Sequence, residues 1–434
     1  MSRHYMSVLG TSGYSECDYC IEETNERYRT KFIQAAVFFL HCKEFTAGDK
    51  ITIFVTQKAK ETHQKALHKE LTALLQKKAL EVQLQYVDIR DGMDDAQQWE
   101  NFNIIYDHIE PEEEVTVDIT HGYRPLPMQL FAILNFAQSL KNITVHGVYY
   151  GVFDRDSKLD YSPIVDYSSY LTITRLANAA SVFSETGNAK SLHDITDSIK
   201  REAAKSEDPC FRSFAELDKV SRKVEQLTSS IHCARGQMNS RNCSSIQKDY
   251  LAYCQERECA SAVQDNTRES RAISQILQHI DSAVMSCFQD VSAETDDFTI
   301  GLRTVDWCLK YDLIQAGFTA LRETVTSWMY AHVDSLEELK IMTKKDNVRD
   351  LREALFNMTN DNNGNGVDEE SLHYLRKSFS EETLTALIRL CSNIRIFRND
   401  INHFGFSSDK PNTTQKLRSH LEECYRDFLV LTEQ

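Results

Sequence analysis

The segment VTVDITHGYRPLP, residues 115–127, contains in order a strand, a loop and the start of a helix. Its first half, VTVDI, is rich in β-branched residues, which favour a strand. The loop supplies hydroxyl, imidazole and guanidinium groups around a glycine, and Pro125 suits the first turn of a helix because proline has no N–H group to leave unpaired. A strand joined to a helix in this way is the repeating unit of a parallel sheet with crossover helices.

The same alternation extends over residues 1–170. Further runs rich in β-branched and aromatic residues are predicted strands, at residues 6–9, 51–55, 82–87 and 143–152. The segments between the runs have helical spacing of apolar residues and are predicted helices, at residues 27–45, 58–78, 95–109 and 126–140. Ile164 and Val165 are expected to add an edge strand. The sequence therefore predicts a Rossmann-like α/β domain over residues 1–170.

From about residue 171 onward the strand signals fade and the 3.6-residue period of helices takes over. Residues 171–297 are expected to form an all-helical connector or insertion, to which the sequence assigns no function. Residues 298–434 are predicted to form a second, all-helical domain. Within it, apolar residues step by three or four from Leu309 to Met329 along one helix face, and residues 381–404 are expected to form a long helix.

Composition restricts the classes of function. The chain of 434 residues has 49 Lys and Arg against 65 Asp and Glu, a formal charge of -16, so nucleic-acid binding would require a local basic patch. No run of 18 apolar residues and no secretory signal is present, which predicts a cytoplasmic protein that binds no membrane. The 12 cysteines are spread thinly, so reduced thiols are expected.

Four predicted strands run into loops that carry polar side chains, and parallel strands place such loops at one edge of the sheet. The loops are residues 10–14, 56–57, 88–92 and 118–125. Glycines that admit close backbone approach, hydroxyls and Arg124 suit a phosphate-bearing ligand. Neither GxGxxG nor the P-loop pattern occurs, which disfavours a dinucleotide or ATP and leaves another nucleotide open. The alternative is that these are turn residues of an inert sheet.

Near the chain's end, RNDINH at residues 398–403 combines a fixed cation with an acid-base group. Five residues at 100° each place Arg398 and His403 about 140° apart on a regular helix, whereas Asn399 and His403 share a face. A long Arg side chain, a helix break or a second copy of the helix would bring the pair together. Metal-free RNA cleavage by the ribose 2′-hydroxyl uses such groups: His moves protons and Arg stabilises phosphorane charge. The alternative is a helix-terminal Arg and a capping His in water.

These motifs together resemble a known family. VLGTSGY at residues 8–14, VDITHGYRPLP at 117–127, PIVDYSSYLTITRLANAASVFSETGN at 163–188 and RNDINHFGF at 398–406 are similar to the CRISPR-associated CARF/HEPN ribonucleases of type III systems. The resemblance implies an N-terminal CARF domain that dimerises and binds a cyclic oligoadenylate activator, and a C-terminal HEPN domain that cuts single-stranded RNA without a metal or other cofactor. It also implies a role in antiviral defence.

The resemblance also assigns residues to each site. The cyclic oligoadenylate would be bound by the converging loops, through Gly10, Thr11, Ser12, Thr56, Gln57, Thr120, His121, Gly122 and Arg124. Arg398, Asn399 and His403 would form one half of a composite catalytic site completed by a second HEPN domain. Two other functions stay open: a sensor whose helical domain only binds a partner or nucleic acid, and slow cleavage of the ring by the CARF domain, where His121 is the one evident base.

Two metal-like patterns are set aside. DNNGNG at residues 361–366 begins like a calcium loop, but its twelfth position is Leu372 where a bidentate Glu is required. Cys17 and Cys20 form a lone CxxC without a second pair at zinc spacing. No metal site is therefore expected.

Overall fold

The computed structural model describes residues 2–122, 125–153, 159–204, 210–236, 245–262, 270–360, 366–406 and 411–433. The chain forms two compact units, Met1–Arg175 and Leu176–Gln434, which are described separately. The boundary between them lies within α6 (Ser168–Thr186), close to the predicted domain boundary at residue 170. The predicted subdivision of the helical part at residue 297 stays a prediction.

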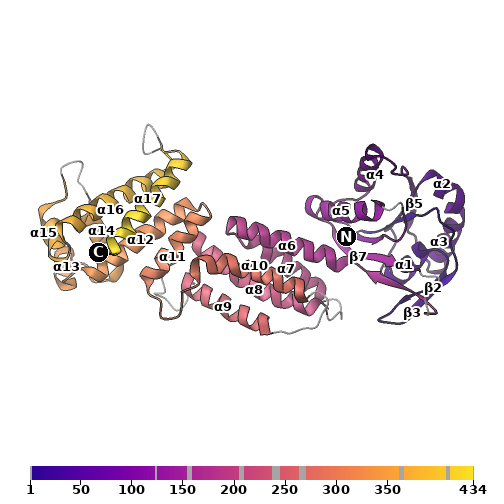
Figure 1. The fold of residues 1–434 in the computed structure, drawn as a ribbon, viewed down its shortest axis with the longest axis horizontal. Helices are drawn as coiled ribbons and strands as arrows, with labels where there is room; N and C mark the ends of the chain where they lie inside the picture. Colours follow the sequence, from indigo (N-terminus) through magenta and orange to yellow (C-terminus); the bar gives the residue numbers. More distant parts are fainter. Residues whose placement is uncertain are drawn as a thin grey trace. The chain divides into compact units, whose positions relative to one another are not determined.

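The N-terminal unit is built on one eight-stranded sheet with the order β3-β2-β8-β7-β6-β1-β4-β5 (Figure 1). The strands are β1 (Arg3–Leu9), β2 (Cys17–Ile21), β3 (Glu26–Thr30), β4 (Lys50–Val55), β5 (Gln83–Asp88), β6 (Glu114–Asp118), β7 (Thr144–Gly151) and β8 (Ser162–Asp166). Strands β7, β6, β1, β4 and β5 are parallel, so the loops after β1, β4, β5 and β6 open at one edge. The predicted Rossmann-like α/β fold is confirmed.

Helices cover both faces of this sheet, because successive residues of a strand point to opposite sides. Tyr5 and Leu9 of β1 pack in one core with α1 (Ile33–His41) and α3 (Lys65–Lys77). Met6 and Val8 pack in a second core with α4 (Asp95–Asp107) and α5 (Pro125–Leu140). Two short elements, α2 (Gln57–Ala59) and the π-helical turn η1 (Lys60–Gln64), connect β4 to α3.

The predicted helix at residues 27–45 is wrong in its first part. Residues Glu26–Thr30 form β3, which pairs antiparallel with β2 as a hairpin, and Asn25 takes a φ of 55° in the connecting turn. Thr30 Oγ1 accepts a hydrogen bond from the Phe32 N–H, and α1 begins only at Ile33. β8 also differs from expectation: it pairs with β7 on one side and β2 on the other, so it is an interior strand.

One half-buried histidine, His41, is expected to make the stability of this unit depend on pH. His41 of α1 stacks on Tyr149 of β7 with ring centroids 3.8 Å apart, and its Nε2 is buried without a hydrogen-bond partner in the described chain. Burial lowers the pKa of His41 from 6.5 to about 4, and the nearby charges of His146 and Lys43 add to this. Because the unfolded chain takes up a proton that the folded one does not, stability is lost as pH falls from 6.5 to about 4.

We expect His41→Phe, which keeps the stack and removes the ionisation, to reduce this loss by up to about 3 kcal/mol. Denaturant unfolding at neutral and acidic pH measures it. The same change at His373, an exposed histidine of the other unit, is the control. An identical pH dependence in the His41 variant and its parent would contradict the expectation.

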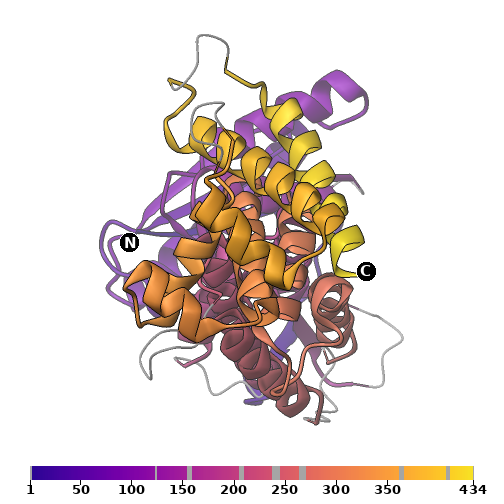
Figure 2. The ribbon, with the colours of Figure 1, turned by 90° about the vertical axis from the view of Figure 1, so that its left-hand side faces the viewer.

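The C-terminal unit is all helical, as predicted. After α6 its helices are α7 (Lys190–Ala203), α8 (Cys210–His232), α9 (Ile246–Ala262), α10 (Ser270–Phe288), α11 (Asp297–Lys310), α12 (Ile314–His332), α13 (Leu336–Thr343), α14 (Val348–Met358), α15 (Glu369–Ser378), α16 (Glu381–Asn402) and α17 (Thr414–Thr432). One core joins α11–α17, and α16 lies beside α17 (Figure 2). None of the described helices is both long enough and apolar enough to span a bilayer.

The apolar stripe from Leu309 to Met329 does not lie on one helix. The chain breaks between α11 and α12, where Asp312 takes a φ of 57° and the Leu313 N–H bonds back to the Cys308 carbonyl. Gly317 allows α12 to approach α17 closely, since a Cβ there would lie 2.5 Å from Leu421 Cδ2. The apolar spacing identified the buried face but did not predict the turn between α11 and α12.

Candidate functional sites

Tyr14 ties together the loops at the sheet edge. Its hydroxyl accepts a hydrogen bond from the Gly10 N–H at 2.9 Å, which closes the loop after β1. Its ring packs edge-on against His63 of η1 and His121 of the loop after β6, with centroids 4.7 and 4.9 Å away. His63 Nε2 in turn lies 2.9 Å from the Ser12 carbonyl oxygen. Three segments distant in sequence therefore form one surface.

A buried carboxylate fixes the loop after β6. Asp118 accepts hydrogen bonds from Ser7 Oγ at 2.6 Å, from Thr120 Oγ1 at 2.5 Å and from the Thr120 N–H at 2.9 Å. Thr120 Oγ1 also accepts from the Gly151 N–H at 2.8 Å. Burial raises the pKa of Asp118, while these donors act in the opposite direction. The Thr120 hydroxyl therefore serves to hold the loop.

His121 presents an unused nitrogen at this edge. The side chain is half-buried, and its Nε2 has no hydrogen-bond partner in the described part of the chain. Burial lowers the pKa of His121, and the Asp118 carboxylate opposes that shift. A neutral imidazole with a free ring nitrogen can donate or accept a hydrogen bond, depending on its tautomer.

The other predicted ligand residues lie around this cluster. Gly10 packs against His121 and Tyr14: a Cβ there would be 3.2 Å from both side chains. Thr11 and Ser12 are exposed, and Gly122 takes a φ of 130°, which favours glycine. The remaining two described residues lie at the start of α2, which continues into η1 and His63. Thr56 is the N-cap of α2, and Gln57 Nε2 donates to Glu61 Oε1 at 2.6 Å. Arg124 lies outside the described residues.

The predicted catalytic residues lie at the end of α16. Arg398 is half-buried and lines a pocket of about 570 Å³ within the C-terminal unit, whereas Asn399 is exposed. His403 is the exposed C-cap residue, and its N–H bonds to the Asn399 carbonyl. Within one chain, Arg398 therefore faces a pocket and His403 lies on the surface beyond the helix end. Helix α16 continues through Asn402 and ends at His403, so it does not break between Arg398 and the histidine.

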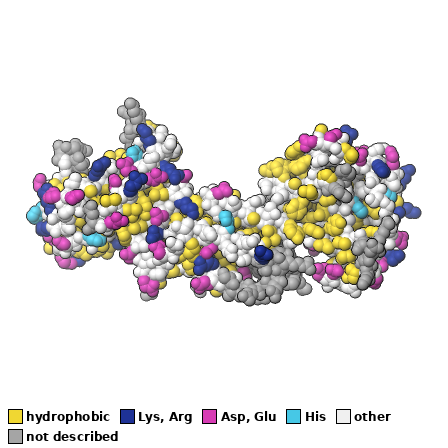
Figure 3. All heavy atoms as spheres, viewed as in Figure 1, with side chains coloured by type: hydrophobic (Ala, Val, Ile, Leu, Met, Phe, Trp, Pro, Cys, Tyr) yellow, Lys and Arg dark blue, Asp and Glu magenta, His cyan; other side chains and the backbone are white. Residues whose placement is uncertain are grey.

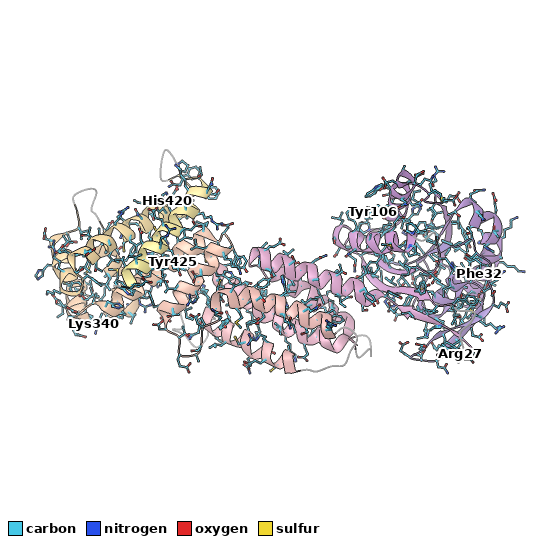
Figure 4. All side chains as sticks on the ribbon, viewed as in Figure 1. Arg27, Phe32, Tyr106, Lys340, His420 and Tyr425 are labelled. Atoms are coloured by element: carbon cyan, nitrogen blue, oxygen red, sulfur yellow. The ribbon has the colours of Figure 1, made fainter. Side chains whose placement is uncertain are left out.

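The turn after α16 is held by hydrogen bonds between Asp400 and Asn412. Asp400 is buried, and its Oδ2 accepts from the Asn412 N–H and Nδ2, both at 3.0 Å. Phe404 and Gly405 take φ values of 58° and 78°, so the chain reverses directly after His403. Within α16, one residue before Arg398, Phe397 stacks on His420 of α17, which Figure 4 labels, with ring centroids 4.0 Å apart. These contacts fix where the Arg398–His403 segment ends.

Comparison with known proteins identifies the N-terminal unit. Residues 4–154 match the model of the CARF domain of the CRISPR system endoribonuclease Csx1. The N-terminal unit is therefore similar to a CARF domain over these residues. A curated relative, the CRISPR-associated protein MJ1674 of Methanocaldococcus jannaschii, is 27% identical over 140 residues, which is 32% of this chain and 20% of that protein. The match therefore spans a fifth of the relative's length.

A solved structure extends the likeness beyond the CARF domain. Enterococcus italicus Csm6 bound to cyclic hexa-2′-fluoro-hexa-dAMP aligns with 99% of this chain and 93% of its own, with a TM-score of 0.50 and 10% identity. At that identity the match shows a shared fold. The predicted resemblance to the CRISPR-associated CARF/HEPN proteins is confirmed: the sequence match lies in the N-terminal unit, and the match over the whole chain is one of fold.

Two residues of the CARF edge escaped the sequence analysis. Asp118 was included in the loop of residues 118–125 but was given no role, although a carboxylate inside an apolar run signals a buried polar anchor. His63 lies within a stretch predicted to be an ordinary helix, and the π-helical turn that places it beside Ser12 leaves no periodic signal. Among the described residues, no cluster of three or more His, Cys, Asp or Glu is placed to hold a metal ion.

Proposed function

We propose that this chain is a cytoplasmic, cyclic-oligoadenylate-activated endoribonuclease that cuts single-stranded RNA without a metal in CRISPR antiviral defence. The observation that carries the proposal is the joining, in one chain, of a CARF domain to a helical unit whose helix α16 ends in Arg398 and His403. The related domain belongs to an endoribonuclease, and the solved structure of similar fold holds a cyclic oligoadenylate analogue.

The CARF edge offers the chemistry for such a ring. Phosphate oxygens accept hydrogen bonds, and the edge supplies Ser12 and a neutral His121 as donors. The sequence adds the Arg124 guanidinium two residues after Gly122. Gly10 leaves room for the His121 and Tyr14 side chains, and Gly122 takes a φ that favours glycine, so both glycines shape the loops that would hold the ring. A ring of two-fold symmetry fits a dimer in which each protomer makes the same contacts.

The surface of α4 and α5 supports the dimer. Exposed apolar side chains on or beside these helices form one aromatic and aliphatic face: Met93, Trp99, Met128, Phe136 and Leu140. Phe136 packs against Phe102 and against Tyr106, which Figure 4 labels. Figure 3 shows hydrophobic side chains gathered over this part of the unit. An apolar face of this kind is a protein contact surface, and we propose that a second copy covers it.

The catalytic step follows from the same residues. The 2′-hydroxyl of the RNA attacks the adjacent phosphorus, and the bond to the 5′-oxygen of the next nucleotide breaks. His403 moves protons between these two oxygens, and Arg398 stabilises the charge that develops on the phosphorane. Asn399 orients His403. Because His403 is exposed in the single chain, a second copy of α16 would complete the site.

We expect cleavage to require a cyclic oligoadenylate, to persist in EDTA and to leave a 2′,3′-cyclic or 3′-phosphate with a 5′-hydroxyl. DNA of the same sequence should be inert, since it lacks the nucleophile. An RNA-cleavage assay with a panel of cyclic oligoadenylates, followed by end-group analysis, measures all of this. Equal rates with and without ligand would exclude the switch, and products with 5′-phosphates or loss of activity on chelation would exclude the mechanism.

One observation favours a second activity. Burial lowers the pKa of His121 and so favours the neutral imidazole, and its Nε2 has no partner among the described residues. At the edge where the ring would lie, this nitrogen can take a proton from a ring 2′-hydroxyl. Slow cleavage of the activator by the CARF domain is therefore the second candidate. Chromatography of the activator in the same assay tests it, and a ring that stays intact over many RNA turnovers would rule it out.

A further inference from the structure

Arginines dominate the pocket of about 570 Å³ in the C-terminal unit. Five guanidinium groups line it against three carboxylates: Arg235, Arg322, Arg349, Arg352 and Arg398 against Asp297, Glu323 and Glu353. The chain as a whole carries a formal charge of -16. This local excess of positive charge is the kind of patch that nucleic-acid binding by an acidic protein requires.

Two of the arginines form ion pairs with the three carboxylates. Arg322 forms ion pairs with both Glu323 and Glu353 and is 10% exposed. Burial alone would raise the pKa of Glu353, but the hydrogen bond and charge of Arg322 bring it below its usual value. Arg352 Nη2 lies 3.8 Å from Asp297 Oδ2. In the part of the chain that the structure describes, the other three pocket arginines form no ion pair.

Two arginines of the pocket lining carry a donor that no described residue satisfies. Arg352 Nε and Arg398 Nε are both buried and have no hydrogen-bond partner among the described residues. A buried donor left unpaired costs free energy, which an acceptor bound in the pocket would restore. The hydroxyls that line the pocket are already used, because each donates to a carbonyl of its own helix: Thr304, Thr319, Thr324, Thr326 and Ser327. The open donors are therefore guanidinium groups, which match phosphate oxygens.

We infer that this pocket binds the phosphate backbone of the RNA strand on one side of the cleaved bond. The inference rests on the proposed function, since Arg398 belongs both to this pocket and to the proposed catalytic pair. The volume of the pocket lies within the range of sites that hold a nucleotide-sized ligand. A neighbouring pocket of about 870 Å³ shares Ala234 and Thr319 with it, so the two pockets adjoin.

Arg235 and Arg349 allow the test, because both are exposed and their replacement disturbs little. Arg349 lies in the first turn of α14, where loss of a positive charge favours the helix dipole. We would place Arg235→Gln and Arg349→Gln together in full-length protein that carries His403→Ala to prevent cleavage. The matched control is Arg389→Gln with Arg426→Gln. These arginines are also exposed, and Arg389 is nine residues before Arg398, on the opposite face of α16.

Fluorescence anisotropy with a short single-stranded RNA, in the presence of the activator, measures affinity at several salt concentrations. We expect the pocket pair to weaken binding roughly tenfold or more at about 0.1 M salt and to lower the slope of log K against log salt by about 1.4, or 0.7 for each lost phosphate contact. The control pair should change neither quantity. Single-stranded DNA should show the same loss, because the contacts are to phosphate. ATP should not compete, whereas competition by ATP would assign the pocket to a free nucleotide.

The inference would be overturned if the Arg235→Gln, Arg349→Gln variant bound RNA as tightly as the Arg389→Gln, Arg426→Gln control. The proposed ribonuclease would still stand if the protein with intact His403 cut RNA on addition of the activator. A parent that neither binds nor cuts RNA would overturn the proposed function itself. The two failures are therefore distinguishable in one set of proteins.

Discussion

Replacing His403 with alanine is expected to lower ring-stimulated RNA cleavage by roughly 10²–10⁴-fold, because the proton transfers of the 2′-hydroxyl mechanism lose their acid-base group. His403 is exposed and takes no part in the packed core of the helical unit, so the variant should fold as the parent does. Single-turnover cleavage with saturating activator measures the loss. Affinity for the cyclic oligoadenylate should stay nearly unchanged, since the CARF edge is made by residues of the other unit.

His373→Ala is the matched control, because His373 is an exposed histidine of the same unit, on α15. Arg398→Ala should behave like His403→Ala, through loss of phosphorane stabilisation. Parent rates in the His403 variant would reject the catalytic assignment. The helical unit would then be a non-catalytic module that binds a partner or nucleic acid.

Removal of the Arg124 guanidinium is expected to weaken binding of the cyclic oligoadenylate by roughly 10-fold to 100-fold, as for loss of a charge-assisted phosphate contact. Isothermal calorimetry with Arg124→Ala measures it. Activation should shift to higher ligand concentration by the same factor, while the rate at saturation is kept, because the ligand acts only through the population of the active state.

Arg90→Ala is the control for this experiment. Arg90 follows β5 at the same sheet edge, but Glu100 holds its Nε through both carboxylate oxygens at 3.0 Å. Its charge is therefore compensated, and little change is expected. Equal losses in the two variants would mean that general electrostatics and not a phosphate contact governs affinity. No heat from any cyclic oligoadenylate with the parent would reject the sensor role.

The candidate ligand residues could be found from sequence because the rule that locates them is local. Each parallel strand is a short apolar run, and the residues that follow it must lie at the carboxyl edge of the sheet. This rule placed Gly10, Ser12, Thr56 and His121 at one edge, where the structure has them. The hairpin of β2 and β3 was missed, since its exposed, charged strand lacks the apolar run that marks a buried strand.

The C-terminal residues show a different limit. The Arg398–His403 spacing is legible in the sequence, but the end of α16 at His403 depends on contacts of Asp400 with Asn412, twelve residues onward. The arginine pocket could not be predicted at all. Its lining comes from α11, α12, α14, α16 and the turn at Arg235, and each arginine alone has the appearance of an ordinary surface charge.

The amino-acid sequence by itself determined the five parallel strands, the helical nature of the second half, the family resemblance and the loops at the carboxyl edge of the sheet, because periodicity and short motifs are properties of neighbouring residues. Only the tertiary structure decided that Ser7 binds Asp118, that Tyr14 joins His63 to His121, and that unpaired arginines share one pocket. Those arrangements depend on which distant segments pack together. Packing is set by burial of the whole apolar surface and by the shape of the core, which no local pattern encodes.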